Sequence, residues 1–109
     1  MPNKNSAQSA LDLLILTILS RRGPSHGYGI ATAIQEVSEE ALRVDEGSLY
    51  PALHRMEEAG WVKAEWTTTE NKRRARIYRI NQSGLKQLAD EKKSWSRFST
   101  GVDRVLRYA

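Results

Sequence analysis

The chain has 109 residues, of which 39% are hydrophobic and 28% charged, enough for one domain with a modest core but not for two. It has no cysteine, which excludes a disulfide framework, a thiol nucleophile and a cysteine metal site. The net charge of +4 favours a polyanionic partner, and no apolar run approaches the ~20 residues of a membrane span. Because the first ten residues are polar, unlike a secretory signal, we expect a cytoplasmic protein with no membrane partner.

The N-terminal half predicts two helices. Residues 1–8 are expected to form an arm, and a helix that ends at Gly23 follows, because apolar residues recur at helical spacing at Leu11, Leu14, Ile15, Ile18 and Leu19. Leu13 and Leu16 lie outside this stripe, so the helix is expected to contact apolar material on a second side. Ser25 is the predicted N-cap of the second helix, which runs to Val37.

A third helix is predicted to end at Gly60. Several residues from Asp45 to Ser48 could cap it, and with Ser48 as the N-cap Pro51 falls in the first turn, where its missing N–H costs little. The helical period predicts one buried stripe, formed by Leu49, Leu53 and Met56. The opposite face then carries Gly47, Pro51, His54 and Glu58, flanked by Ser48, Tyr50 and Arg55.

The C-terminal half predicts a hairpin and one long helix. Residues 61–66 and 75–80 have strand composition, and a polar, basic tip of residues 67–74 separates them. Five of the eight residues from Lys72 to Arg79 are basic and none is acidic. The last helix begins at Asn81 or Ser83 and, if it reaches Arg107, spans ~36 Å.

This order of elements predicts a mainly α fold with a small β-hairpin, namely a winged helix-turn-helix followed by a long C-terminal helix. We assign residues 1–80 to a DNA-binding domain and residues 81–109 to a dimerisation helix within the same compact unit. The outward face of the third helix suits a major groove about 12 Å wide. The tip cations Lys72, Arg73 and Arg74 are the best candidates for phosphate contacts.

Two residues on the third helix have alternative roles. Tyr50 either packs against the hairpin or contacts a phosphate. Arg55 either pairs with an acidic residue or contacts DNA.

The C-terminal helix predicts a homodimer. Its distal apolar residues cannot all reach the core of their own domain, and burying each is worth ~1.5–3 kcal/mol. These residues are Trp95, Phe98, Val102, Val105 and Leu106. We expect a partner helix to cover them, with Leu13 and Leu16 of the first helix as receptors. A two-fold dimer then predicts a palindromic DNA site.

Nothing in the sequence predicts an enzyme or a cofactor. His26 and His54 lack the spacing of a zinc site, and there is no nucleophile elbow and no phosphate-binding loop. Two other binding functions are compatible with a winged helix: a protein-interaction module, against which the basic tip argues, and an RNA-binding winged helix, whose stacking platforms the aromatic residues do not fit.

Several segments together resemble the PadR family of bacterial and archaeal regulators, in its short-tailed branch with one C-terminal helix. The likeness runs from about Leu11 to the end and is most specific in the Gly-Ser-Leu-Tyr-Pro-Ala-Leu-His-Arg stretch of residues 47–55. It is also carried by residues 13–16, 23–29, 60–62 and 73–80. One departure is Ile77, where many relatives carry a second aromatic residue.

The resemblance implies a homodimer that represses transcription, often of transporter or detoxification genes, and releases DNA on binding a small aromatic or amphipathic molecule. It implies that Ser48, Tyr50, Pro51 and His54 face the groove and that Arg73, Arg74 and Arg76 face the backbone. Tyr28 would lie near DNA or support the third helix. Trp95 would either line an effector cavity between protomers or simply pack in the dimer interface.

Overall fold

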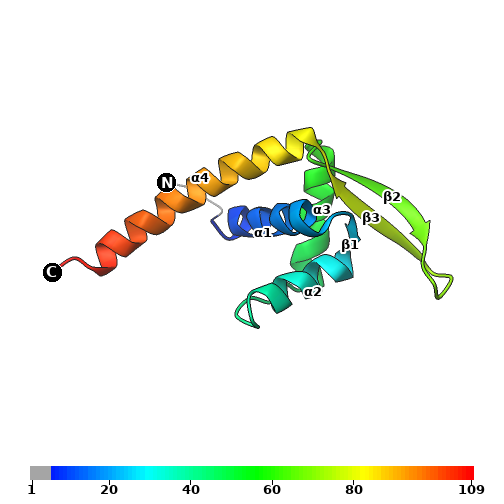
Figure 1. Ribbon diagram of the computed structural model, residues 1–109, viewed down its shortest axis with the longest axis horizontal. Coiled ribbons are helices and arrows are strands. Elements are labelled where there is room, and N and C mark those ends of the chain that lie inside the picture. Colours follow the sequence, from blue (N-terminus) through cyan, green and yellow to red (C-terminus); the bar gives the residue numbers. More distant parts are fainter. Residues whose placement is uncertain (1–5) are drawn as a thin grey trace.

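The computed structural model describes residues 6–109, which form four helices and one small sheet (Figure 1). The elements in chain order are α1 (Ser6–Arg22), β1 (Ser25–His26), α2 (Gly27–Val37), α3 (Glu46–Glu58), β2 (Val62–Thr68), β3 (Arg74–Ile80) and α4 (Gln82–Leu106). The expected fold class, mainly helical with a winged hairpin and a long last helix, is confirmed. None of the helices within these residues is both long and apolar enough to cross a bilayer.

Two N-terminal boundaries differ from the prediction. Helix α1 begins at Ser6, so residues 6–8 of the expected arm are helical, while residues 1–5 lie outside the described residues. Helix α2 is capped by His26 rather than Ser25, since the His26 Nδ1 atom accepts a hydrogen bond from the Gly29 N–H at 3.1 Å. Ser25 lies one residue too far from the helix, because α2 begins at Gly27 and the cap position is therefore His26.

Helix α3 also begins earlier than it would if Ser48 were its N-cap. Its N-cap is Asp45, whose Oδ1 atom accepts a hydrogen bond from the Ser48 N–H at 2.8 Å. Pro51 therefore lies inside the helix rather than in its first turn. A proline at this position cannot donate to the Gly47 carbonyl one turn earlier.

The sheet has three antiparallel strands in the order β1-β3-β2. The strands of the hairpin extend beyond the predicted ends, because Thr67 and Thr68 are β-branched and pair with Ala75 and Arg74. The tip is therefore shorter than expected and comprises residues 69–73. Strand β1 was not predicted, since two residues are too few to show a strand pattern.

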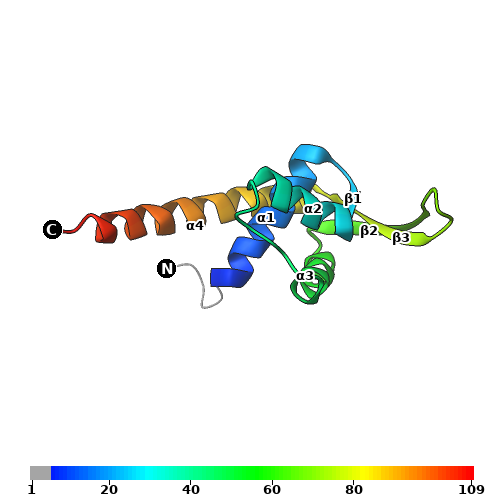
Figure 2. The same cartoon turned by 90° about the horizontal axis from the view of Figure 1, so that it is seen from below.

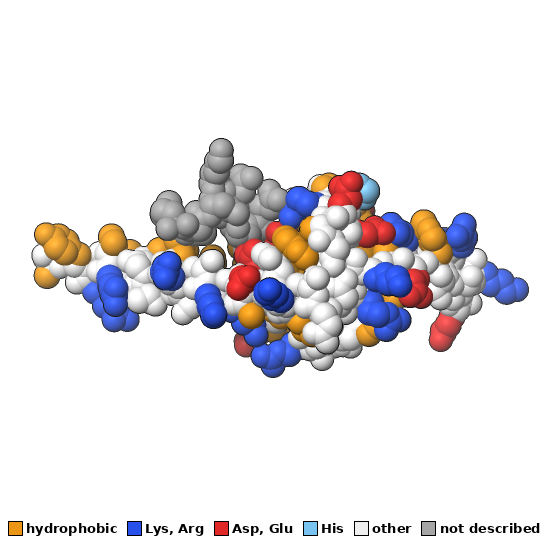
Figure 3. All heavy atoms as spheres, turned by 90° about the horizontal axis from the view of Figure 1, so that it is seen from above, with side chains coloured by type: hydrophobic (Ala, Val, Ile, Leu, Met, Phe, Trp, Pro, Cys, Tyr) orange, Lys and Arg blue, Asp and Glu red, His pale blue; other side chains and the backbone are white. Residues whose placement is uncertain are grey.

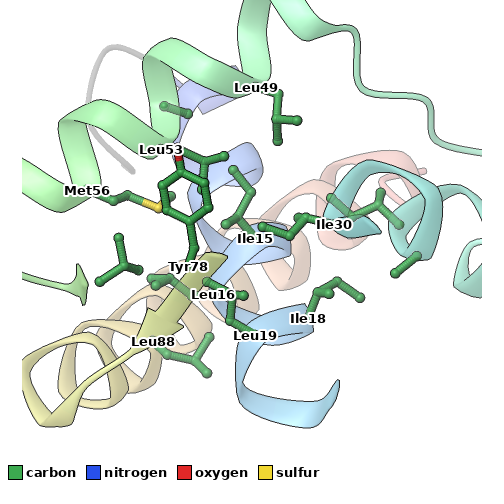
Figure 4. Close-up of a cluster of buried hydrophobic side chains, with 14 residues drawn as sticks. Ile15, Leu16, Ile18, Leu19, Ile30, Leu49, Leu53, Met56, Tyr78 and Leu88 are labelled. Atoms are coloured by element: carbon green, nitrogen blue, oxygen red, sulfur yellow. The ribbon is translucent and has the colours of Figure 1, made fainter. Parts of the chain in front are cut away.

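Helix α1 lies at the centre of the core and contacts α2, α3, α4 and β3 (Figure 4). Ile15 and Leu19 are fully buried, as predicted from the apolar stripe. Leu16, expected on a surface open to a partner, has no exposed area because β3 and α4 cover that side of α1. Its assignment as a dimer contact is therefore wrong, and Leu16 belongs to the core of its own chain.

Helix α4 follows the sheet without an intervening loop. Asn81 directly succeeds β3 and caps α4, its Oδ1 atom accepting a hydrogen bond from the Gly84 N–H at 2.9 Å and its Nδ2 atom donating to the Gly60 carbonyl at 2.8 Å. The first half of α4 packs on α1, and the second half projects beyond the domain. The wing and the C-terminal end of α4 therefore point to opposite ends of the molecule (Figure 2).

Candidate nucleic-acid interface

The outward face of α3 is the first part of the site. Leu49, Leu53 and Met56 are completely buried, as the helical period predicted. The residues predicted on the opposite face, Gly47, Ser48, Pro51 and His54, are all exposed. No other element of the described chain covers this face. The His54 Nε2 atom lies 3.5 Å from Glu58 Oε1, and both side chains are largely exposed.

Tyr50 extends from α3 towards the start of α2. A Cβ atom added to Gly27 would come within 2.7 Å of the Tyr50 ring, so only glycine allows the ring to lie there. Tyr50 thus packs against the start of α2, while part of the ring stays open to solvent. Tyr28, on the first turn of α2, is strongly exposed beside it.

The tip of the wing is a tight turn. The Thr69 N–H donates to the Arg73 carbonyl at 2.8 Å, and the Lys72 N–H donates to the Thr69 carbonyl at 2.9 Å. Lys72 has φ of 59°, in the left-handed region. Lys72, Arg73 and Arg74 are exposed, and none of the ion pairs within residues 6–109 includes them. Their charges are therefore available to an anion.

Arg76, expected to face the DNA backbone, instead joins the wing to α3. Its two terminal nitrogens donate to the Glu57 carboxylate at 3.1 and 2.9 Å. The hydrogen bond to Glu57 raises the pKa of Arg76. Since Glu57 neutralises this guanidinium, the structure gives it a bracing role, and its assignment as a backbone contact is not supported.

Arg55 is likewise held by an acidic residue. Its guanidinium donates two hydrogen bonds of 2.9 Å to Asp12 of α1, a carboxylate that is only 5% exposed. The hydrogen bond to Asp12 raises the pKa of Arg55. Of the two predicted roles of Arg55, the structure supports pairing with an acid, and it argues against a contact with DNA.

A hollow of about 760 Å³ connects these parts of the surface. It lies between the wing, as far as its tip, the start of α2 and Tyr50 of α3. Its lining includes aromatic rings, two unpaired arginines and one exposed acidic residue at the tip, namely Tyr28, Tyr50, Trp66, Tyr78, Arg73, Arg74 and Glu70. Burial raises the pKa of Tyr78, so this phenol stays neutral. The surface thus combines uncharged aromatic rings with free cations.

The predicted dimer residues lie along α4 and α1, away from this surface. Trp95 and Val102 are partly exposed, and Val105 and Leu106 are 74% and 77% exposed. Figure 3 shows hydrophobic side chains collected at the C-terminal end of α4. The rings of Trp95 and Phe98 contact each other with centroids 5.7 Å apart. Leu13 is half-buried on α1.

Three residues important to this site were missed from the sequence. Asp12 carries a signal that could have revealed it, since a lone acid within an apolar helical run needs a basic partner. Glu57 carries no such signal. Trp66 is 57% exposed on the wing, with Arg74 Cζ 4.7 Å from its ring centroid, and strand composition alone gave it no role. Residues 6–109 contain no group of three or more histidine or acidic side chains placed to hold a metal ion.

Comparison with known proteins gives consistent matches. The model of the transcriptional regulator PadR-like family matches residues 15–90. A transcriptional regulator of Mycobacterium tuberculosis is 33% identical over 87 residues, which cover 80% of this chain and 79% of the relative. A transcriptional regulator from Clostridium thermocellum superposes with a TM-score of 0.82 at 28% identity, covering 93% of this chain and 97% of that one. A PadR-like transcriptional regulator from Bacillus cereus superposes with a TM-score of 0.76 at 28% identity, covering 97% of this chain and 100% of that one.

The exposed face of α3 beside a basic wing defines a winged helix-turn-helix DNA-binding protein. The family match makes this a class of transcriptional regulators rather than enzymes. The chain belongs to the PadR-like family of transcriptional regulators.

Proposed function

We propose that this protein is a sequence-specific repressor that binds a palindromic operator as a homodimer and is released by a small-molecule effector. The outward face of α3 is the observation that carries the proposal. Its small and polar residues, Ser48, Pro51 and His54, are exposed over a fully buried apolar stripe, and free cations stand on the neighbouring wing. Repression and release by an effector are what the family resemblance implies.

Base recognition is assigned to the exposed face of α3. A side chain that contacts base edges discriminates between sequences, whereas a phosphate contact does not. Footprinting on the intergenic DNA upstream of the gene would locate the operator. His54→Ala should then weaken binding to the operator while leaving binding to unrelated DNA nearly unchanged, and equal weakening on both DNAs would contradict base recognition by His54.

Backbone contacts are assigned to the wing cations Arg73, Arg74 and Lys72, with Tyr28 and Tyr50 beside them. Each phosphate neutralised contributes about 0.9 to the slope of log K against log salt. Arg73→Ala/Arg74→Ala should therefore lower this slope by roughly 2 per protomer. The matched control removes two exposed lysines from the middle of α4, Lys92 and Lys93, and should leave the slope unchanged. An unchanged slope in the wing variant would contradict the assignment.

Dimerisation is assigned to the distal half of α4 and to Leu13 of α1. The exposed apolar surface of Trp95, Val102, Val105 and Leu106 supports it, because burying such side chains is worth ~1.5–3 kcal/mol each. Phe98 extends the same stripe.

The oligomeric state can be measured by analytical ultracentrifugation. Val105→Asp/Leu106→Asp should shift the chain from dimer to monomer. Thr100→Asp places one such charge on a different face of α4 and should leave the dimer intact. A wild-type protein that sediments as a monomer at micromolar concentration would refute the assignment.

Effector binding is assigned to the rings of Trp95 and Phe98. Phe98 lines an apolar groove of about 610 Å³ along α4, together with Val102 and Val105, and the Trp95 ring contacts Phe98 from outside this lining. A planar aromatic probe such as 9-aminoacridine should quench tryptophan fluorescence of the wild type. Quenching that persists unchanged in Trp95→Leu would show that Trp95 is ordinary packing.

A further inference from the structure

The face of the wing that looks towards α3 carries a ladder of aromatic and cationic side chains. Trp66 on β2 pairs directly with Arg76 on β3, and Arg74 lies diagonally across from it on the same face. The Cζ atoms of Arg74 and Arg76 are 4.7 and 5.5 Å from the centroid of the Trp66 ring. Both distances are within the range of a cation–π interaction. One exposed ring therefore contacts two guanidinium groups.

The two arginines differ in what their charges do. Arg76 is occupied by Glu57, and its Cζ atom also lies 5.8 Å from the centroid of Tyr78. Arg74 is exposed and takes part in none of the ion pairs of the described chain. A cation–π contact uses the flat face of the guanidinium, so the N–H groups in its plane stay free to donate. Arg74 is thus oriented by an aromatic ring and keeps its donors.

The hollow beside this ladder has the chemistry of a backbone-binding site. Tyr28, Tyr50 and Trp66 offer aromatic surface that suits the apolar face of a deoxyribose. Arg73 and Arg74 stand at its rim as unpaired cations that suit a phosphate. With Arg76 neutralised by Glu57, the remaining cations that line the hollow are Arg73 and Arg74, which outnumber the single acidic lining residue, Glu70.

From these contacts we infer that the hollow binds one sugar–phosphate unit of DNA and that Trp66 is a positioning residue, which aims Arg74 at the phosphate. The inference rests on the proposed function, which assigns this surface to DNA. Arginine has many rotamers, and fixing the guanidinium before DNA arrives removes part of the entropy cost of binding. Trp66 therefore acts through Arg74 rather than by a charge of its own.

A double-mutant cycle tests the link between the two residues. A backbone contact is independent of sequence, so a mixed-sequence duplex of about 30 base pairs, roughly three helical turns, serves as the probe. Trp66→Ala should weaken binding about twofold to fivefold, the range of an exposed cation–π contact. In an Arg74→Ala background the same substitution should have much less effect, and Trp66→Phe should restore most of the affinity by keeping an aromatic face.

Equal weakening by Trp66→Ala in both backgrounds would overturn the inference, because Trp66 would then act independently of Arg74. Thermal unfolding of each variant shows whether the wing remains folded, and Thr67→Ala on the same strand is the control for a change in an exposed wing residue. If Arg73→Ala weakens binding but the Trp66 and Arg74 substitutions have additive effects, the hollow still contacts DNA and only the positioning role of Trp66 is rejected. Failure of the wild type to bind duplex DNA in a salt-dependent way would instead reject the proposed function.

A fluorescence measurement gives a second readout that a purely structural role would not change. In Trp61→Phe/Trp95→Phe the only tryptophan left is Trp66. Saturating duplex should shield its ring from acrylamide quenching if the hollow is filled by the DNA backbone. Equal quenching with and without duplex would overturn the inference.

Discussion

The ion pair between Arg55 and Asp12 predicts that Arg55 stabilises the fold without contributing to DNA binding. Arg55→Met keeps most of the apolar stem but removes the guanidinium, leaving the Asp12 carboxylate without its two hydrogen bonds of 2.9 Å. Breaking a fully buried pair costs about 3–5 kcal/mol. Because about a third of the Arg55 side chain is exposed, we expect a loss of about 2–3 kcal/mol.

The loss can be measured by urea unfolding at a fixed protein concentration. For a domain of this size it corresponds to a fall in Tm of roughly 10 °C. The double variant Asp12→Leu/Arg55→Met should recover most of the stability, because neither charge is then left unpaired in the core. Arg104→Met, at a fully exposed arginine on α4, is the matched control and should change stability by less than ~0.5 kcal/mol.

The same variant separates the two roles that the sequence left open for Arg55. If Arg55 makes no phosphate contact, the salt dependence of DNA binding by Arg55→Met should equal that of the wild type at a temperature where both are folded. A slope lower by about 1 per protomer, together with unchanged stability, would refute the reasoning.

Three further predictions follow from close packing and burial. Gly84→Ala should destabilise the fold by about 1–3 kcal/mol, because its Cβ would collide with the Trp61 carbonyl; unfolding at the wild-type urea concentration would contradict this. Gly27→Ala should displace the Tyr50 ring and weaken DNA binding while circular dichroism stays unchanged, and wild-type affinity would show that the ring position does not matter. Burial raises the pKa of Tyr78, so the unfolded chain loses this proton first as pH rises and the wild type loses stability above about pH 10. Tyr78→Phe should lack that part of the alkaline decline, and a difference between the two proteins that is independent of pH from 8 to 11 would argue against it.

The periodic features of the fold were predictable from the sequence. Leu49, Leu53 and Met56 recur at helical spacing, which determines both the buried stripe of α3 and its exposed opposite face. The long last helix and its Asn81 cap follow from the same kind of local pattern. Such features depend on residues that are only a few positions apart, and a single sequence shows these spacings directly.

Contacts between distant segments were not predictable in the same way. Asp12 and Arg55 are 43 residues apart, and nothing local to Arg55 indicates which acid it meets. Leu16 was assigned to the dimer contact because the sequence indicates a second apolar side of α1 but not that elements of the same chain cover it. Arg76 could not be distinguished from its basic neighbours without knowing that Glu57 of α3 lies against it.

The junction at Asn81 has a consequence for the spacing of the DNA half-sites that the protein can bind. The Asn81 cap lies directly after β3 and is hydrogen-bonded to the Gly60 carbonyl, so no linker separates the winged helix-turn-helix from α4. In a dimer joined through α4, the distance and angle between the two winged helix-turn-helix units would therefore be fixed. Adding one base pair between the half-sites rotates one half-site by ~34° relative to the other. A dimer of fixed geometry would then bind only one of the two half-sites of such an operator.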